Sequence, residues 1–252
     1  MAASASPSPS ASPAVPEPVT PDAPRTIARP LLTQSWRDVA FVHWAAAPDD
    51  VAPLLPPGTR PDTLDGVTYI GLVPFRMHRV GWLGLPGLPY LGSFPETNVR
   101  LYSVDEQGRR GVVFLSLDAS RLVAVGTARA GFGLPYVWSR MSVHRGNDTV
   151  AYVSSRHRGR GADNRVTVRI GNPIAQPTEL EHFVTARWGL HHRLGGRTRY
   201  LPNAHPRWPL RRAELTAYDS ELIVAAGLPE PVGEPVSVLF SPGVPVRFGR
   251  PC

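Results

Sequence analysis

Hydrophobic and polar residues alternate along the segment Phe94–Ser103, whose sequence is FPETNVRLYS. Because successive side chains of a β-strand point to opposite faces, this spacing predicts a strand with Glu96, Asn98 and Arg100 on one face. The opposite face would carry the less polar side chains of Thr97, Val99 and Leu101. Such a strand would place one face in an apolar layer and the other on a wet surface or in a polar pocket.

Further segments combine apolar and β-branched residues with flanking Gly, Pro, Asn or Asp, which is typical of strands. Gly111–Leu117 follows a turn at 106–110 and is the expected antiparallel partner of the strand above. The pair Gly195-Gly196 predicts a hairpin turn between its two flanking segments. The other expected strands are Val39–Trp44, Val67–Phe75, Tyr136–Val143, Thr149–Ser154, Arg165–Ile170, Trp188–Arg193, Arg197–Leu201, Arg212–Tyr218, Val236–Phe240 and Val244–Phe248.

Four short helices are expected between these strands. Asp118 is the expected N-cap of one of them, and Thr178 with Glu181 has the spacing of a capping box at the start of another. The expected helices are Pro48–Leu55, Ala119–Ala130, Glu179–Arg187 and Glu221–Ala226. Strands and helices do not alternate regularly, so the pattern predicts an α+β fold in which the sheet is mainly antiparallel.

The first 33 residues differ in composition from the rest of the chain. They consist largely of Ala, Ser and Pro, with too little apolar surface to offset the entropy of ordering, so we expect a disordered tail over residues 1–33 and a single domain over residues 34–252. Within the domain, residues 80–95 are rich in Gly and Pro but unusually apolar. They are expected to form either a loop packed on the core or a lid over a pocket.

The chain contains no lysine, so its net charge of +7 comes entirely from arginine. Catalysis through a side-chain imine requires lysine and is therefore excluded. The single cysteine, Cys252, excludes an intrachain disulfide and a cysteine-rich zinc site. The sequence also lacks a phosphate loop, a Gly-x-Ser-x-Gly elbow and a His-Glu-x-x-His motif, and its histidines show no metal-ligand spacing. We therefore expect no metal and no cofactor. A zinc site assembled from distant residues such as His43, His144 and Glu96 stays open, but no spacing favours it.

The densest basic run, Arg156–Arg165, lacks the interleaved aromatic residues that stack on bases, and its glycines suggest a solvated hairpin loop. We therefore expect no nucleic-acid partner. No apolar run is long enough to span a bilayer, and the N-terminus does not resemble a secretion signal. The expectation is a cytoplasmic protein without a membrane partner, and the pattern leaves its oligomeric state open.

Glu96, Asn98 and Arg100 form the best candidate site, and two interpretations of it remain open. In the first, the three side chains form a buried network in which the charges pair with each other. In the second, they line a pocket, where Arg100 would bind a carboxylate or phosphate through two hydrogen bonds and Glu96 would act as an acid or base.

Ordered blocks over residues 34–250 resemble the uncharacterised YqjF-like family. The blocks are Phe41–Trp44, Leu55–Gly58, Asp65-Gly66, Gly71–Met77, Phe94–Arg100, Phe114–Asp118, Gly133–Tyr136 with Ser139–Met141, Leu180–Phe183 and His205–Leu210. That family is similar in fold to acetoacetate decarboxylase. The resemblance implies a β-barrel or cone of mainly antiparallel strands, with a few short helices packed outside and a pocket within.

In the decarboxylase an imine-forming lysine, a carboxylate-orienting arginine and a glutamate act together. Glu96 resembles the glutamate on its strand, and Gly131–Tyr136 resembles the stretch that carries the lysine, but Tyr136 stands in the place of lysine. Arg76 and Arg100 are both candidates for the orienting arginine. The resemblance therefore implies the fold and the pocket without the imine chemistry.

Three functions are consistent with these observations. The first is binding of a small polar or acidic organic molecule by Glu96, Asn98, Arg100 and Tyr136, with Arg76 as a further candidate. The second is lysine-independent proton transfer on a carbonyl or enol substrate, with Glu96 and Tyr136 as catalytic candidates. The third is a structural or interaction protein in which the polar strand is only a buried network.

Overall fold

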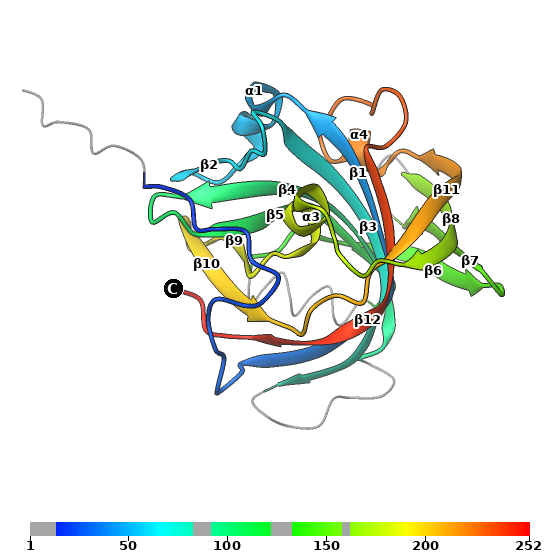
Figure 1. Ribbon diagram of the computed structural model, residues 1–252, viewed down its shortest axis with the longest axis horizontal. Coiled ribbons are helices and arrows are strands. Elements are labelled where there is room, and N and C mark those ends of the chain that lie inside the picture. The colour runs from blue at the N-terminus through cyan, green and yellow to red at the C-terminus, as the bar shows by residue number, and fades with distance from the viewer. Residues whose placement is uncertain (1–13, 83–91, 122–132, 158–161) are drawn as a thin grey trace, which may run out of the picture.

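The structure is a computed structural model that describes residues 14–82, 92–121, 133–157 and 162–252. Within these ranges twelve strands form one sheet (Figure 1). The strands are β1 (Leu32–Ala46), β2 (Thr59–Pro61), β3 (Thr68–Trp82), β4 (Phe94–Asp105), β5 (Arg110–Ala119), β6 (Tyr136–Arg145), β7 (Thr149–Arg156), β8 (Asp163–Pro173), β9 (Gly189–Leu194), β10 (Arg197–Ala204), β11 (Arg211–Ser220) and β12 (Ser237–Phe248). The helices are α1 (Pro48–Val51), the 3-10 turn η1 (Ala52–Leu54), α3 (Glu179–Thr185) and α4 (Leu222–Ala225).

The sheet closes on itself. Its hydrogen-bonded order runs β5-β6-β7-β8-β11-β12-β1-β3-β4, and β4 pairs again with β5, which completes a ring of nine strands. On the other side, β10 joins β12 and β9 joins β5, so these two strands close a second ring on the shared strands β5, β4, β3, β1 and β12. Among the described pairings only β5–β6 and β5–β9 are parallel. The predicted fold, an α+β barrel of mainly antiparallel strands, is confirmed.

Strand β4 has two buried faces, so of the two alternatives left open by the sequence its polar face lies in the interior and not on a wet surface. Val99 and Leu101 of β4 are fully buried in an apolar cluster with Tyr152 of β7 and Leu222 of α4. The other face of β4 points into the second ring, where Phe183 and Val184 of α3 are also buried. In Figure 1 helix α3 lies within the outline of the barrel. One strand therefore separates a dry core from the barrel interior.

Local features predicted from sequence occur where they were expected. Thr178 Oγ1 accepts a hydrogen bond from the backbone N–H of Glu181 at 3.2 Å, and Glu181 Oε2 accepts one from the backbone N–H of Thr178 at 2.7 Å, so the capping box is formed. Gly195 and Gly196 both have positive φ, at 60° and 76°, and join β9 to β10 in a hairpin. Helix α3 ends at Thr185, two residues earlier than expected.

Two expectations were wrong. Asp118 does not cap a helix: it lies inside β5 with its side chain fully buried, and the helix predicted for 119–130 falls mostly outside the described residues, as does 83–91 of the loop expected at 80–95. The two predicted C-terminal strands are one strand, β12. Gly243 continues it at φ 120°, where a Cβ would lie 1.8 Å from the carbonyl oxygen of Trp36.

Part of the N-terminal segment lies against the barrel. The backbone N–H of Glu17 donates to the carbonyl of Gly108 at 2.8 Å, and the indole N–H of Trp188 donates to the carbonyl of Thr20 at 3.0 Å. The division of the chain at residue 33 stays a prediction, and these contacts attach residues on its N-terminal side to the domain. None of the helices in the described ranges has the length and apolar character needed to cross a membrane.

The buried ion pair between Asp118 and Arg156 provides a test of this architecture. Arg156 donates to both carboxylate oxygens of Asp118, at 2.8 and 2.9 Å, and Ser139 donates a third hydrogen bond at 2.7 Å. We expect Arg156→Met to lower the free energy of unfolding by about 3–5 kcal/mol, because it leaves a buried carboxylate without its cation. Urea denaturation measures the change.

The exposed pair of Arg169 and Glu214 supplies the matched control. The substitution Arg169→Met removes the same type of side chain from a pair in water and should cost at most about 1 kcal/mol. Equal losses in the two variants would contradict the structural role assigned to Asp118.

Candidate functional site

The interior of the second ring contains a cavity of about 300 Å³. This is at the lower end of the sizes of small-molecule sites, and most of its wall is apolar. Residues from eight strands, from α3 and from the segment after β10 line it: Leu32, Gln34, Trp36, Val39, Phe41, Val73, Phe75, Met77, Val80, Gly92, Phe94, Glu96, Asn98, Arg100, Val112, Phe114, Leu117, Leu134, Tyr136, Thr185, Arg187, Leu190, Leu201, Asn203, His205, Trp208 and Phe248. Four of the five residues selected from the sequence, Glu96, Asn98, Arg100 and Tyr136, are among them.

Arg76, the fifth, does not reach the cavity. It lies between Phe75 and Met77 on β3, and these two neighbours point inward. The Arg76 side chain is 41% exposed on the opposite face, with its Nε 3.4 Å from a carboxylate oxygen of Asp38. The structure therefore separates Arg76 from the other candidates, and Arg100 is the arginine that lies on the same strand face as Glu96.

Glu96 and Tyr136 form a buried pair. The Tyr136 hydroxyl donates a hydrogen bond of 2.9 Å to Oε2 of Glu96. Burial raises the pKa of Glu96 to about 8, against the lowering effect of the Tyr136 hydrogen bond and with a further rise caused by the charge of Asp118. Burial and the proximity of Glu96 raise the pKa of Tyr136 well above its ordinary value. At neutral pH Glu96 is therefore mainly a carboxylic acid, with a proton to donate.

Arg100 is buried and hydrogen-bonded to neutral oxygens. Its Nε donates to the hydroxyl of Tyr102 at 3.1 Å, and its Nη2 donates to the carbonyl of Val184 at 2.8 Å. It is only 9% exposed, yet within the described ranges no carboxylate lies close enough to form an ion pair with it. Glu96 is four residues away, about 13 Å along the strand. The two side chains thus do not neutralise each other.

A second arginine, Arg187, enters the cavity from the turn after α3. Its Nε donates to the carbonyl of Phe183 at 2.7 Å, and its Nη1 pairs with Asp62, which also pairs with Arg110. Its Nη2 is buried and has no hydrogen-bond partner among the described residues. Sequence analysis placed Arg187 only at the end of a helix. Its position depends on Asp62, 125 residues earlier in the chain, so no local pattern identifies it.

Gly71 of β3 makes room for Arg100. It pairs with His43 on β1 and with Arg100 on β4, and a Cβ at this position would lie 3.0 Å from the His43 ring and 3.1 Å from the Arg100 side chain. His43 Nε2 lies 2.6 Å from the Tyr102 hydroxyl that also accepts from Arg100. Burial and the charges of Arg100 and Arg187 hold the pKa of His43 well below its ordinary value, so the ring is neutral.

The remaining polar residue on the inner face of β4 is Asn98. Its Oδ1 is buried, and the part of the chain that the structure describes offers it no hydrogen-bond partner. Buried polar atoms are normally hydrogen-bonded, and unpaired ones are costly. The cavity therefore has unpaired donor capacity at Arg187, an unpaired acceptor at Asn98, a protonated carboxyl at Glu96 and a cation without a counterion at Arg100.

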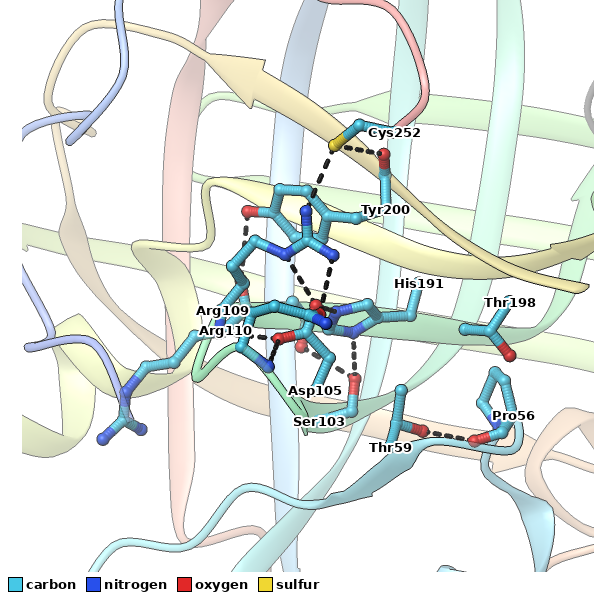
Figure 2. Close-up of polar contacts among 12 residues, drawn as sticks. Pro56, Thr59, Ser103, Asp105, Arg109, Arg110, His191, Thr198, Tyr200 and Cys252 are labelled. Carbon is cyan, nitrogen blue, oxygen red and sulfur yellow. Dashed lines mark hydrogen bonds and ion pairs between the residues drawn. The ribbon is translucent and has the colours of Figure 1, made fainter. Parts of the chain in front are cut away.

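Figure 2 shows a second polar cluster, and its residues Ser103, Asp105 and His191 are not among those that line the cavity. Ser103 Oγ is 2.8 Å from Nδ1 of His191, whose Nε2 is 3.3 Å from a carboxylate oxygen of Asp105. This sequence of contacts resembles a catalytic triad, but all three side chains are buried and none lines the cavity. Burial opposes ionisation of Asp105, but hydrogen bonds from His191 and Arg109 lower its pKa to about 2. The cluster joins the β4–β5 turn to β9.

The described residues contain no group of three His, Cys, Asp or Glu side chains that could hold a metal ion. His43 is fully buried beside Tyr102, whereas His144 lies near the exposed end of β6 and contacts Ser142 at 3.0 Å. These two histidines and Glu96 are therefore not assembled into a common site.

Comparisons with known proteins agree with the fold. The family DUF2071, described as Uncharacterized conserved protein (COG2071), matches residues 33–245. The protein YqjF of Bacillus subtilis (strain 168), itself described as uncharacterized, is 31% identical over 208 residues, which are 82% of this chain and 86% of that protein.

Two solved structures of similar proteins share the fold at low sequence identity. An acetoacetate decarboxylase-like enzyme from Sphingomonas wittichii RW1 has a TM-score of 0.58 at 11% identity, with 92% of this chain and 93% of that chain covered. The enduracididine biosynthesis enzyme MppR complexed with pyruvate has a TM-score of 0.56 at 18% identity, with 96% and 98% covered.

The raised pKa of Glu96 gives a testable pH dependence. The unfolded carboxyl loses its proton near pH 4.5, whereas the native one keeps it to about pH 8. Between these values the native state binds more protons than the unfolded state, so this group makes stability fall as pH rises, by up to about 1.4 kcal/mol per pH unit. Below pH 4.5 this group causes no loss of stability, and above pH 8 the loss has reached its full size.

Urea denaturation of the wild type and of Glu96→Gln between pH 5 and pH 8 measures this contribution. The free energy of unfolding of Glu96→Gln, relative to that of the wild type, should rise steadily as the pH rises. Glu214→Gln, which changes an exposed carboxylate, should run parallel to the wild type. Parallel curves for Glu96→Gln as well would show that Glu96 ionises normally.

Proposed function

This chain belongs to the DUF2071 family of uncharacterized conserved proteins, and we propose that it binds a small organic acid in its barrel cavity. One observation carries the proposal: the Arg100 guanidinium is buried in the cavity wall without a carboxylate partner among the described residues. A charge in such a place is unfavourable unless an opposite charge compensates it. An anionic ligand would supply that charge.

The neighbouring groups favour a carboxylate. Arg187 adds an unpaired Nη2 donor to the same cavity, and guanidinium groups bind planar carboxylates through paired hydrogen bonds. Asp62 is already shared between Arg187 and Arg110. Protonated Glu96 adds no negative charge that would repel the ligand, and it can donate a hydrogen bond to a carbonyl or hydroxyl oxygen. The cavity thus offers a positive site and a neutral donor.

The ligand of a protein with the same fold also supports the proposal. MppR, which shares the fold, has been solved in complex with pyruvate, a small organic acid. This chain has no lysine, so any similarity of function concerns recognition of an acid and not a side-chain imine. Pyruvate is accordingly a suitable first probe.

The substitution Arg100→Met tests the proposal because its effects on binding and stability should have opposite signs. Loss of the guanidinium should weaken pyruvate binding at least about 30-fold, since one partner of a buried charge pair is removed. The free energy of unfolding of the ligand-free protein should stay unchanged or rise, because an uncompensated buried cation has been replaced by an apolar chain of similar length. Isothermal titration calorimetry and urea denaturation measure the two effects.

Arg76→Met is the matched control, since Arg76 lies on the same sheet but outside the cavity. It should leave the affinity for pyruvate unchanged. Failure of the wild type to bind any small carboxylate, or equal binding by Arg100→Met, would refute the proposed function.

One observation favours a second candidate function, proton transfer on an enol or carbonyl substrate. The Tyr136 hydroxyl already donates to Glu96, whose carboxyl holds a proton at neutral pH. In an enol-to-keto conversion, Glu96 would give its proton to the enol carbon. The enol hydroxyl proton would pass to Tyr136 while Tyr136 passes its own proton to Glu96, so both groups return to their starting states. Arg100 would hold the carboxylate of the substrate.

Exchange of the methyl protons of pyruvate in deuterated water, followed by proton NMR, tests this activity. The wild type should exchange them well above the buffer rate, and Glu96→Gln should reduce the rate by at least about 100-fold, the typical contribution of a general acid or base. The affinity of Glu96→Gln for pyruvate should change little, because the Arg100 contact remains. Binding without exchange in the wild type would eliminate the enzymatic candidate and leave the binding function.

A further inference from the structure

The apolar part of the cavity is built largely from aromatic rings. Trp36 of β1 and Trp208, in the segment after β10, are stacked with ring centroids 5.9 Å apart and an interplanar angle of 15°. Phe75 meets the edge of Trp36 at 6.0 Å, and Phe41 meets Trp208 at 5.1 Å. His205 completes the group, 4.9 Å from Trp208. We call these five residues the aromatic wall, and all of them line the cavity.

The aromatic wall presents no free donor from its two indoles. The Trp36 indole N–H donates to the side chain of Gln34 at 2.8 Å, and the Trp208 indole N–H donates to the carbonyl of Thr185 at 3.0 Å. Burial lowers the pKa of His205 to about 4, and its Nδ1 lies 2.7 Å from the carbonyl oxygen of Pro206, so the ring is neutral at pH 7. What remains toward the cavity is uncharged, polarizable ring surface.

The aromatic wall runs along the cavity from the charged end: the guanidinium carbon of Arg100 lies 5.5 Å from the centre of the Phe41 ring. Along the inner face of β4 the order is Arg100, Asn98, Glu96 and Phe94, and each of these residues pairs across the sheet with β3. Arg100 lies opposite Gly71, which in turn lies opposite His43 on β1. Phe94 lies opposite Met77, which lies opposite Trp36. Trp36 is therefore about six residues from Arg100 along the strand register, with Glu96 between them. Trp208 lies nearer the cation, because its ring is 5.1 Å from that of Phe41.

From this order we infer that the ligand is an organic acid with an aromatic body, its carboxylate at Arg100 and Arg187 and its ring against Trp36 and Trp208. The inference rests on the proposed function, because it uses the same carboxylate site. A carbonyl or hydroxyl oxygen between the two ends of the ligand would accept a hydrogen bond from protonated Glu96. The cavity of about 300 Å³ is as large as the volume that about ten water molecules occupy in liquid water. This is enough for one ring and a short side chain.

Ring stacking explains why an aromatic body is favoured over an aliphatic one. Flat rings pack against indole faces and edges with a gain beyond simple burial of area. Two tryptophans with their N–H groups already satisfied can contribute only such packing. A ligand as small as pyruvate would reach the arginines and Phe41 beside them and would leave the two indoles without contacts.

Three probes that contain different combinations of a carboxylate, a carbonyl and a ring test the inference. Phenylpyruvate has the acid, the carbonyl and a ring; pyruvate lacks the ring; benzyl methyl ketone has the ring and the carbonyl without the acid. By isothermal titration calorimetry, phenylpyruvate should bind at least about tenfold tighter than pyruvate, from burial of the ring. Benzyl methyl ketone should bind at least about tenfold weaker than phenylpyruvate.

The substitution Trp36→Leu tests whether the aromatic wall causes the tighter binding of phenylpyruvate. The Trp36 indole bonds only to another side chain, so its removal leaves no backbone group unpaired. The variant should lose most of the preference for phenylpyruvate while keeping the affinity for pyruvate. Trp138→Leu is the matched control, because Trp138 stacks on His157 outside the cavity, and it should preserve the preference.

The outcomes separate the inference from the proposed function. Equal affinities for pyruvate and phenylpyruvate, or a preference untouched by Trp36→Leu, would overturn the aromatic body and leave the acid-binding function standing. If neither acid binds, both fall. If the ketone binds as tightly as phenylpyruvate, the arginines do not select a carboxylate, and the acid-binding function falls with the inference that rests on it.

Discussion

The site depends on one constraint, a guanidinium held inside a barrel by neutral oxygens. Arg100 is hydrogen-bonded to a tyrosine hydroxyl and to the last turn of α3. These contacts fix its orientation without cancelling its charge. The same chain shows the other way to bury a charge at Asp118, whose carboxylate is fully paired with Arg156 and Ser139. The contrast between these two residues distinguishes a structural ion pair from a buried cation whose charge no described carboxylate neutralises.

Several distant parts of the chain cooperate to hold that guanidinium. Gly71 provides the space, since a side chain there would contact both His43 and Arg100. Helix α3 provides the carbonyl of Val184, and its capping box fixes where the helix begins. Asp62 holds Arg187 beside the same cavity. Strand β4 joins these supports to the apolar core on its other face, where Val99 and Leu101 are fully buried.

The chain shares the fold of acetoacetate decarboxylase-like enzymes but has no lysine that could form a side-chain imine. Its barrel contains a cavity lined by a glutamate and a buried arginine, and a tyrosine donates a hydrogen bond to that glutamate. Low dielectric in the cavity acts on these groups in opposite directions: it keeps the carboxyl protonated and leaves the arginine as the uncompensated charge. This electrostatic arrangement suits recognition of an anion, and the neutral acid beside it suits proton donation.

The sequence alone determined the local features that short-range physics controls. Alternation in Phe94–Ser103 gave the two faces of β4, Thr178 and Glu181 gave the start of α3, and Gly195-Gly196 gave the β9–β10 turn. The absence of lysine excluded an imine from the outset. The pattern misplaced Asp118, because a buried carboxylate that pairs with a distant arginine has the same local sequence as a helix cap. The family resemblance offered Arg76 beside Arg100 as the orienting arginine, and the structure places the Arg76 side chain outside the cavity. Only the tertiary structure decided that Arg100 and Glu96 do not pair, that Arg187 joins them and that Trp36 and Trp208 form a common wall. Each of these relations joins strands or turns far apart in the chain, and such contacts depend on barrel closure and strand register, which no local pattern encodes.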